Sequence, residues 1–193
     1  MRWTGRQGVV MFLMFAGCGP AAQRSPYSTY RDTPIRNSQA AQEACQKGLE
    51  YIEHGDDAAA EQAFRESLGY DITNAAAHNN LGLLLLKQKQ WYSASWEFAY
   101  STQIQPQSSV PRGNLGLVFE AVGQYDKAIN EYEAALKIDA DSVQVMGQLA
   151  RTFVKSGRSP ERLKDLLERL VVRADPDWSQ WARGQLIRLG SHQ

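Results

Sequence analysis

Few side chains in this 193-residue chain are placed to do acid–base, nucleophilic or metal chemistry. The three histidines, His54, His78 and His192, show none of the short spacings at which paired histidines hold a metal. His54 precedes Asp56 and Asp57 in a predicted turn, where capping of the following helix explains the carboxylates. His78 stands in a predicted helix with no acidic residue beside it. No phosphate-binding glycine loop or nucleophile-elbow motif occurs, so we expect no enzyme and no cofactor or metal site.

The two cysteines, Cys18 and Cys45, are too few for a disulfide framework or a cysteine-rich zinc site. We expect Cys45 to fill a small site on a helix face and not to act as a nucleophile. The chain has 21 basic and 21 acidic residues and a pI of about 6.8, which argues against nucleic acid as a partner. A hydrophobic share of 43% is enough for a folded core.

The first seventeen residues have the pattern of an export signal. Arg2 and Arg6 precede an apolar run from Gly8 to Gly17, which is much shorter than the roughly 20 residues of a membrane-spanning helix. The sequence Phe-Ala-Gly-Cys that ends at Cys18 resembles the bacterial lipobox, with Phe15 where leucine is usual. That resemblance implies cleavage before Cys18 and acylation of this cysteine, which would anchor the protein to a membrane. The alternative is an ordinary secretory peptide in which Cys18 is incidental.

Residues 18–38 are rich in proline, serine and threonine and show no helical or strand period, which is typical of an extended tether. Gly19, and not an aspartate, follows the cysteine. In this respect the segment resembles outer-membrane lipoproteins, which implies a bacterial cell envelope location facing the periplasm.

Three kinds of residue recur every 34 positions after the tether. They are Gly48, Gly82 and Gly116; Ala60, Ala94 and Ala128; and the aromatic residues Phe64, Phe98 and Tyr132. Gly123 and Gly157 mark a shared turn, which Gly55 also fits and Lys89 does not. A period in this range is typical of stacked helical repeats. Residues 111–139 resemble the tetratricopeptide repeat (TPR) pattern most fully.

The resemblance implies an all-α fold, a right-handed α-solenoid of about four TPR helix pairs over residues 39–174, with a C-terminal capping helix and tail in 175–193. We expect the fourth pair at 143–156 and 159–173, with Arg162 where the pattern has alanine, and the last helix at 176–189. Within a pair, the glycines are expected where the two helices meet, with the alanines facing them. Phe98 and Tyr132 are expected to fill the space toward the next repeat.

In TPR proteins the first helix of each pair lines the inner face, which is where partners bind. Carried over by position, the partner-binding groove consists of Cys45, Leu49, Ile52, Asn79, Leu83, Leu86, Lys87, Gly113, Leu117, Glu120, Arg151, Val154 and Lys155. Family members that clamp a terminal carboxylate have lysine and asparagine where this chain has Leu83 and Leu117. The sequence therefore favours a groove for an amphipathic helix or an extended apolar segment. The alternative is that these leucines pack only against neighbouring repeats.

Two hypotheses follow for the function. The first is a membrane-anchored adaptor whose groove binds a protein or peptide partner in the cell envelope, with no small-molecule substrate. This layout resembles TPR lipoproteins that assist pilus secretin or outer-membrane protein assembly. The second is a self-associating structural component of the envelope. Residues 40–74 carry eight acids against Lys47 and Arg65, and residues 143–193 carry nine bases against five acids. This polarity either orients a partner or is simply a solvated surface.

Overall fold

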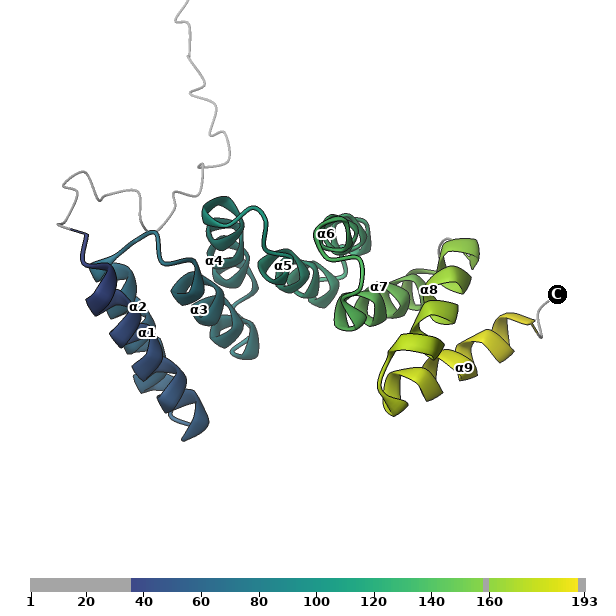
Figure 1. Cartoon of the computed structure of the whole chain (residues 1–193), viewed down its shortest axis with the longest axis horizontal. Coiled ribbons are helices and arrows are strands. Elements are labelled where there is room, and N and C mark those ends of the chain that lie inside the picture. The colour runs from purple at the N-terminus through teal and green to yellow at the C-terminus, as the bar shows by residue number, and fades with distance from the viewer. Residues whose placement is uncertain (1–35, 158–159, 191–193) are drawn as a thin grey trace, which may run out of the picture. The chain divides into compact units, whose positions relative to one another are not determined.

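The computed structural model describes residues 36–157 and 160–190, and these residues form nine α-helices. Their bounds are α1 Ser38–Glu53, α2 Asp57–Tyr70, α3 Ala75–Lys87, α4 Trp91–Ile104, α5 Val110–Ala121, α6 Tyr125–Ile138, α7 Val143–Ser156, α8 Pro160–Arg173 and α9 Pro176–Gly190. Consecutive helices pack as pairs, and the second helix of each pair also packs on the first helix of the next (Figure 1). This is the predicted all-α TPR arrangement. Residues 1–17 and most of the predicted tether, with Cys18, lie outside the described residues.

Short polar side chains set the starts of three helices. Asn37, Asp56 and Asn74 each accept a hydrogen bond from a backbone N–H three residues on, with lengths of 3.0, 3.0 and 3.1 Å. Such caps satisfy donors that have no partner inside the helix. The capping role predicted for the acidic turn after His54 is confirmed by Asp56. Pro111 lies in the first turn of α5, where its missing N–H costs nothing.

Each of the first three pairs is closed by an aromatic ring lying on a bare glycine backbone. A Cβ added at Gly48, Gly82 or Gly116 would lie 2.4, 2.7 or 2.5 Å from the ring of Phe64, Phe98 or Tyr132. All three rings are fully buried. The nearest side chain to each glycine is therefore the ring of its own repeat, and not the alanine that the sequence pattern suggested.

The fourth pair departs from this rule. Ala150 replaces the glycine, and α8 packs less extensively on α7 than the second helix does in the other pairs. Helix α9 covers the end of the array, as predicted for a capping helix. The ring of Trp178 lies 2.8 Å from the position that a Cβ on Gly147 would take, and Ala182 is fully buried in the same core.

The turns inside the pairs require a left-handed backbone at one residue. Gly55, Gly123 and Gly157 adopt φ of 76°, 74° and 66°, and Lys89 adopts 61° at the same phase. Glycine reaches this conformation without strain, whereas the Cβ of any other residue approaches the following carbonyl. The departure from the repeat pattern at Lys89 is thus a strained turn.

We expect Lys89→Gly to stabilise the chain by about 0.5–1 kcal/mol, since the relief of left-handed strain exceeds the added freedom of glycine in the unfolded chain. Gly123→Lys at the equivalent turn is the matched control and should destabilise by a similar amount. Urea unfolding followed by circular dichroism measures both. If Lys89→Gly instead lowers the free energy of unfolding, the contacts of the lysine side chain stabilise the fold by more than its left-handed backbone strain destabilises it.

Candidate functional site

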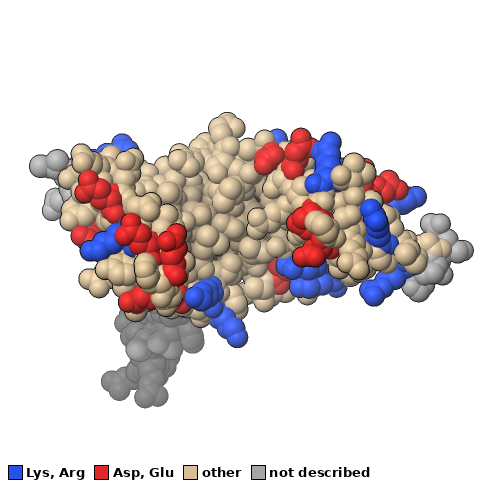
Figure 2. Space-filling view, turned by 60° about the horizontal axis from the view of Figure 1, so that its bottom comes forward, with Lys and Arg blue, Asp and Glu red and all other residues tan. Residues whose placement is uncertain are grey.

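The inner helices α1, α3, α5 and α7 present two columns of side chains in step with the repeat. One column is Leu49, Leu83, Leu117 and Arg151, and the other is Ile52, Leu86, Glu120 and Val154. Leu49, Ile52, Leu83 and Val154 are 37–40% exposed, which is high for large apolar side chains on neighbouring helices. Packing between repeats therefore leaves part of each side chain open to solvent. Figure 2 shows a broad uncharged area between two charged groups on the side that it brings forward.

Each predicted groove residue has a definite place in the structure. Leu49, Ile52, Leu83, Val154, Lys87 and Lys155 are exposed; Asn79, Leu86, Leu117 and Arg151 are half-buried; Cys45, Gly113 and Glu120 are buried. The apolar members and Asn79 fit a groove, whereas the charged members are bound to other parts of the chain. Lys87 pairs with Asp57 of the first repeat at 2.7 Å. Burial raises the pKa of the Cys45 thiol, which makes it unreactive.

A cleft of about 260 Å³ opens between α3, α5 and α7 in the middle of this face. Leu83, Leu117 and Val145 supply apolar walls, and Asn114 and Gln148 supply amides. Gly113 lies in the same cleft, and a Cβ there would come within 3.3 Å of Val145. The absence of a side chain at residue 113 therefore keeps α5 and α7 close and the cleft open.

A column of amide side chains runs beside the apolar ones and was missed by the sequence analysis. It consists of Gln46, Asn80, Asn114 and Gln148, which follow the same 34-residue step. The Asn114 amide donates to Asn79 Oδ1 at 2.8 Å, and Asn80 donates to Cys45 Sγ at 3.8 Å. Amides carry both donors and acceptors and so match the backbone of an extended chain. The repeat period was the signal that would have found them.

Glu120 occupies a column position that is apolar in the other repeats, and its charge is satisfied inside the array. Lys155 Nζ lies 2.7 Å from Glu120 Oε1, and Tyr132 and Thr152 donate to Oε2 at 3.1 and 3.3 Å. Arg151 Nε makes no hydrogen bond, although it lies 3.4 Å from Glu120 Oε1. Burial raises the pKa of Glu120, but these partners outweigh it and hold the pKa below its usual value. Three predicted groove residues therefore form an internal ion cluster.

His78 does have an acidic partner, so the sequence-based expectation about it was wrong. Its Nδ1 lies 2.7 Å from Glu97 Oε2 on α4, and its ring stacks on Tyr100 with centroids 5.3 Å apart. The Nε2 atom lies 2.9 Å from the carbonyl oxygen of Ile72. The ring is fully buried and joins α3, α4 and the preceding loop, which is a structural role.

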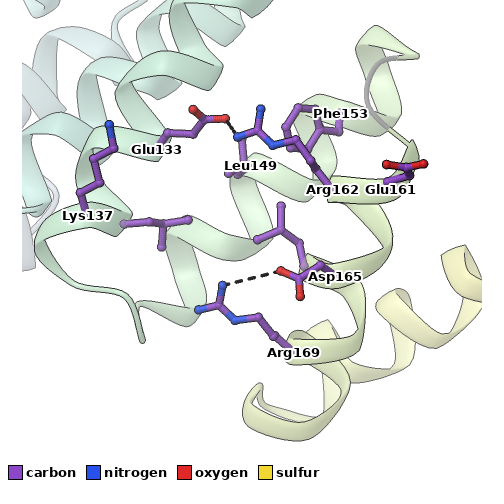
Figure 3. A pocket seen from close by; sticks show the side chains of 10 residues that line it. Glu133, Lys137, Leu149, Phe153, Glu161, Arg162, Asp165 and Arg169 are labelled. Carbon is purple, nitrogen blue, oxygen red and sulfur yellow. Dashed lines mark hydrogen bonds and ion pairs between the residues drawn. The ribbon is translucent and has the colours of Figure 1, made fainter.

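A second cleft, of about 540 Å³, lies between α6, α7 and α8 (Figure 3). Its floor is apolar, with Leu149 and Phe153, and its rim is charged. Arg162 reaches across the cleft to Glu133, and its guanidinium also lies 5.4 Å from the centre of the Phe153 ring. Arg162 stands where the other repeats have alanine, in the pair that packs least extensively. The guanidinium charge of Arg162 is paired with the Glu133 carboxylate inside the cleft.

Within residues 36–157 and 160–190, no cluster of three or more histidine, cysteine or acidic side chains is arranged to hold a metal ion. None of the helices in these ranges has the length and hydropathy needed to cross a bilayer.

Comparison with known proteins identifies the repeats. Residues 45–105 and 112–142 match models of the tetratricopeptide repeat. Anaphase-promoting complex subunit 3 of Schizosaccharomyces pombe (strain 972 / ATCC 24843) is 26% identical over 126 residues, which are 65% of this chain and 19% of that protein. The chain thus spans about a fifth of the length of this curated relative.

Two solved structures show the same fold. The first TPR of Spaghetti (RPAP3) bound to HSP90 peptide SRMEEVD has a TM-score of 0.62 and 16% identity, covering 64% of this chain and 98% of that one. YrrB, described as a TPR protein with an unusual peptide-binding site, has a TM-score of 0.64 and 18% identity, covering 77% and 76%. Residues 45–105 and 112–142 are therefore tetratricopeptide repeats, and the described part of the chain has the same fold as these solved structures.

We expect Glu120→Gln to lower the free energy of unfolding by about 1–3 kcal/mol, because Arg151 and Lys155 lose the carboxylate with which they pair. The folded-state pKa of Glu120 is lowered, so its contribution is complete above pH 4.5 and is lost as the pH falls through that lowered pKa. Unfolding free energies of wild type and variant should therefore converge in acid. Glu53→Gln, an exposed change on α1, is the control and should stay within about 0.5 kcal/mol of wild type. A gap between Glu120→Gln and wild type that does not change with pH would contradict this assignment.

Proposed function

We propose that this protein is a membrane-anchored adaptor whose inner face binds an extended, largely apolar segment of a protein partner. The observation that supports it most directly is the central cleft, where half-exposed leucines at 83 and 117 adjoin Asn114 and Gln148. Leucines at successive repeats suit apolar side chains of the ligand. Amides beside them suit its backbone, which an extended segment leaves unpaired.

The charge of the cleft argues for an apolar ligand over an acidic one. Arg151 and Lys155 on α7 already face Glu120, so a carboxylate binding to these cations would compete with a buried internal acid. Leu83 and Leu117 offer no charge-assisted hydrogen bond. The peptide SRMEEVD, which accompanies the Spaghetti domain, contains acidic residues and is in our proposal the wrong class of ligand for this groove.

The membrane anchor in this proposal is an acylated Cys18. It rests on the short apolar run and the lipobox-like residues before the cysteine, which lie outside the described part of the chain. An envelope role, such as assistance to pilus, secretin or outer-membrane protein assembly, follows from the anchor and the groove together. TPR arrays act generally as non-catalytic scaffolds, which agrees with binding and not catalysis as the task.

The groove is tested by selecting binders from a library of displayed peptides against the full chain. We expect the recovered peptides to be rich in apolar residues at alternate positions and to lose at least tenfold in affinity for Leu83→Glu with Leu117→Glu. Val122→Glu, at a valine that is 40% exposed like Leu83, is the control and should bind as wild type does. Circular dichroism checks that all variants remain helical. Equal binding by the double variant would move the site off this face.

The anchor is tested separately by Cys18→Ser, expressed in a bacterium that acylates lipoproteins. We expect the variant to move from the membrane fraction to the soluble fraction, because it cannot carry acyl chains. Mass spectrometry of the mature wild-type N-terminus should find an acylated cysteine. Retention of the variant in the membrane would exclude Cys18 as the anchor and leave the groove proposal intact.

A further inference from the structure

One position of the inner helices recurs every 34 residues and holds Cys45, Asn79, Gly113 and Gly147. In the first two repeats, the side chain at this position accepts a hydrogen bond from an amide of the next inner helix. Asn80 donates to Cys45 Sγ at 3.8 Å, and Asn114 donates to Asn79 Oδ1 at 2.8 Å. Gln148 is the next amide in this series, but Gly113 has no side chain to receive its hydrogen bond. The third repeat therefore leaves open a space that the first two repeats fill.

In the fourth repeat, an aromatic ring covers the glycine at this position. Three alternate atoms of the six-membered ring of Trp178, Cη2, Cε2 and Cε3, lie 2.8, 2.9 and 2.9 Å from the position that a Cβ on Gly147 would take. Because these distances are nearly equal, the ring lies face-on against the glycine backbone. The fold itself thus shows that an indole fits a bare glycine at this position of the inner helices.

The space over Gly113 is not covered in this way. The nearest side-chain atom to a Cβ added there is Val145 Cγ2, at 3.3 Å, and the central cleft of about 260 Å³ opens beside it. A cavity of about 150 Å³ is large enough to bind benzene, so this cleft has room for the two rings of an indole. The described residues that line the cleft are all uncharged, which suits an aromatic side chain and not an ionised one.

We propose that the central cleft binds a tryptophan side chain of the partner segment, face-on against Gly113 and between α5 and α7. The site extends the proposed function, on which it rests, by an anchor position in the groove. Gly113 is then the residue that determines specificity, because the side chains at the same position in the first two repeats would occupy the space that the indole needs.

Polar groups of the cleft favour tryptophan over leucine or phenylalanine. An indole N–H is a donor that needs an acceptor when it is buried. Ser109, Ser142 and Asn114 line the cleft, and their hydroxyl or amide oxygens can accept this hydrogen bond. Gln148 also lines the cleft, and its amide, which has no side chain at residue 113 to donate to, can donate to a backbone carbonyl of the partner beside the indole.

N-acetyltryptophanamide is a probe that tests the cleft without a peptide. Added to the full chain with labelled methyl groups, it should shift the NMR signals of Leu83, Leu117 and Val145, which line the cleft. N-acetylleucinamide should bind roughly tenfold more weakly, since it brings no aromatic ring and no indole donor. Equal binding of the two probes would overturn the proposal. So would the absence of any shift, as expected if another part of this chain or a second copy closed the cleft.

Gly113→Asn fills the cleft with the residue that the second repeat carries at the same position, so the variant should fold. We expect its affinity for N-acetyltryptophanamide to fall roughly tenfold or more. Gly69→Asn, at an exposed helical glycine of α2 with nothing within 4 Å of an added Cβ, is the matched control and should bind the probe as wild type does. Circular dichroism checks the fold of both variants, and the comparison of the two probes on wild type needs no variant. Unchanged affinity of a folded Gly113→Asn chain would contradict the site.

Peptide selection separates this site from the rest of the groove. Peptides selected on the wild-type chain should share a tryptophan at one fixed position, and peptides selected on Gly113→Asn should not. Peptides that depend on Leu83 and Leu117 but show no preference for tryptophan would overturn the tryptophan site and leave the proposed groove intact. Binding of N-acetyltryptophanamide at the cleft without recovery of any peptide would support the indole site and overturn the groove.

Discussion

The contact of a buried aromatic ring with a bare glycine backbone fixes the distance between the two helices of a pair. Phe64, Phe98 and Tyr132 each fill the space where the Cβ of their partner glycine would stand, and all three are fully buried. Because the contact recurs every 34 residues, the inner helix approaches its outer helix in the same way in each of the first three pairs. Side chains of equal phase then align into columns, so the groove depends on a packing constraint on the opposite side of the same helices.

Where that constraint weakens, the surface changes character. In the fourth pair, Ala150 occupies the position of the repeated glycine and Arg162 that of the repeated alanine. The second cleft opens beside α8 in this pair. The arginine occupies the cleft with its own contacts, to Glu133 and to the face of Phe153. Trp178 of α9 covers Gly147 next to it and closes the core at this end. The end of the array is therefore sealed by side chains that the regular repeats do not have.

The features that recur with the 34-residue period could be predicted from the sequence. Ion pairs and hydrogen bonds that occur only once could not. Helix bounds, the glycine and aromatic positions and the apolar columns all repeat. A position found in one repeat therefore predicts the equivalent position 34 residues later. The pairing of His78 with Glu97 joins residues 19 apart, and the pairing of Glu120 with Lys155 joins residues 35 apart. Both pairs occur once, so no repetition marks them. The amide column does repeat, and it escaped because amides are less conspicuous than leucine or glycine.

The repeat also supplies an internal standard against which each departure can be explained. Glu120 is a charged residue in an otherwise apolar column. Lys155, Arg151 and Tyr132 contact its carboxylate and offset the free-energy cost of burying it. Lys89 departs from glycine and is a strained turn. Tyr100 on α4 departs from Glu66 and Ala134 of the neighbouring repeats, and its ring stacks on the buried ring of His78. Each departure from the repeat is thus explained by the side chain or backbone that it contacts, and not by the repeat pattern itself.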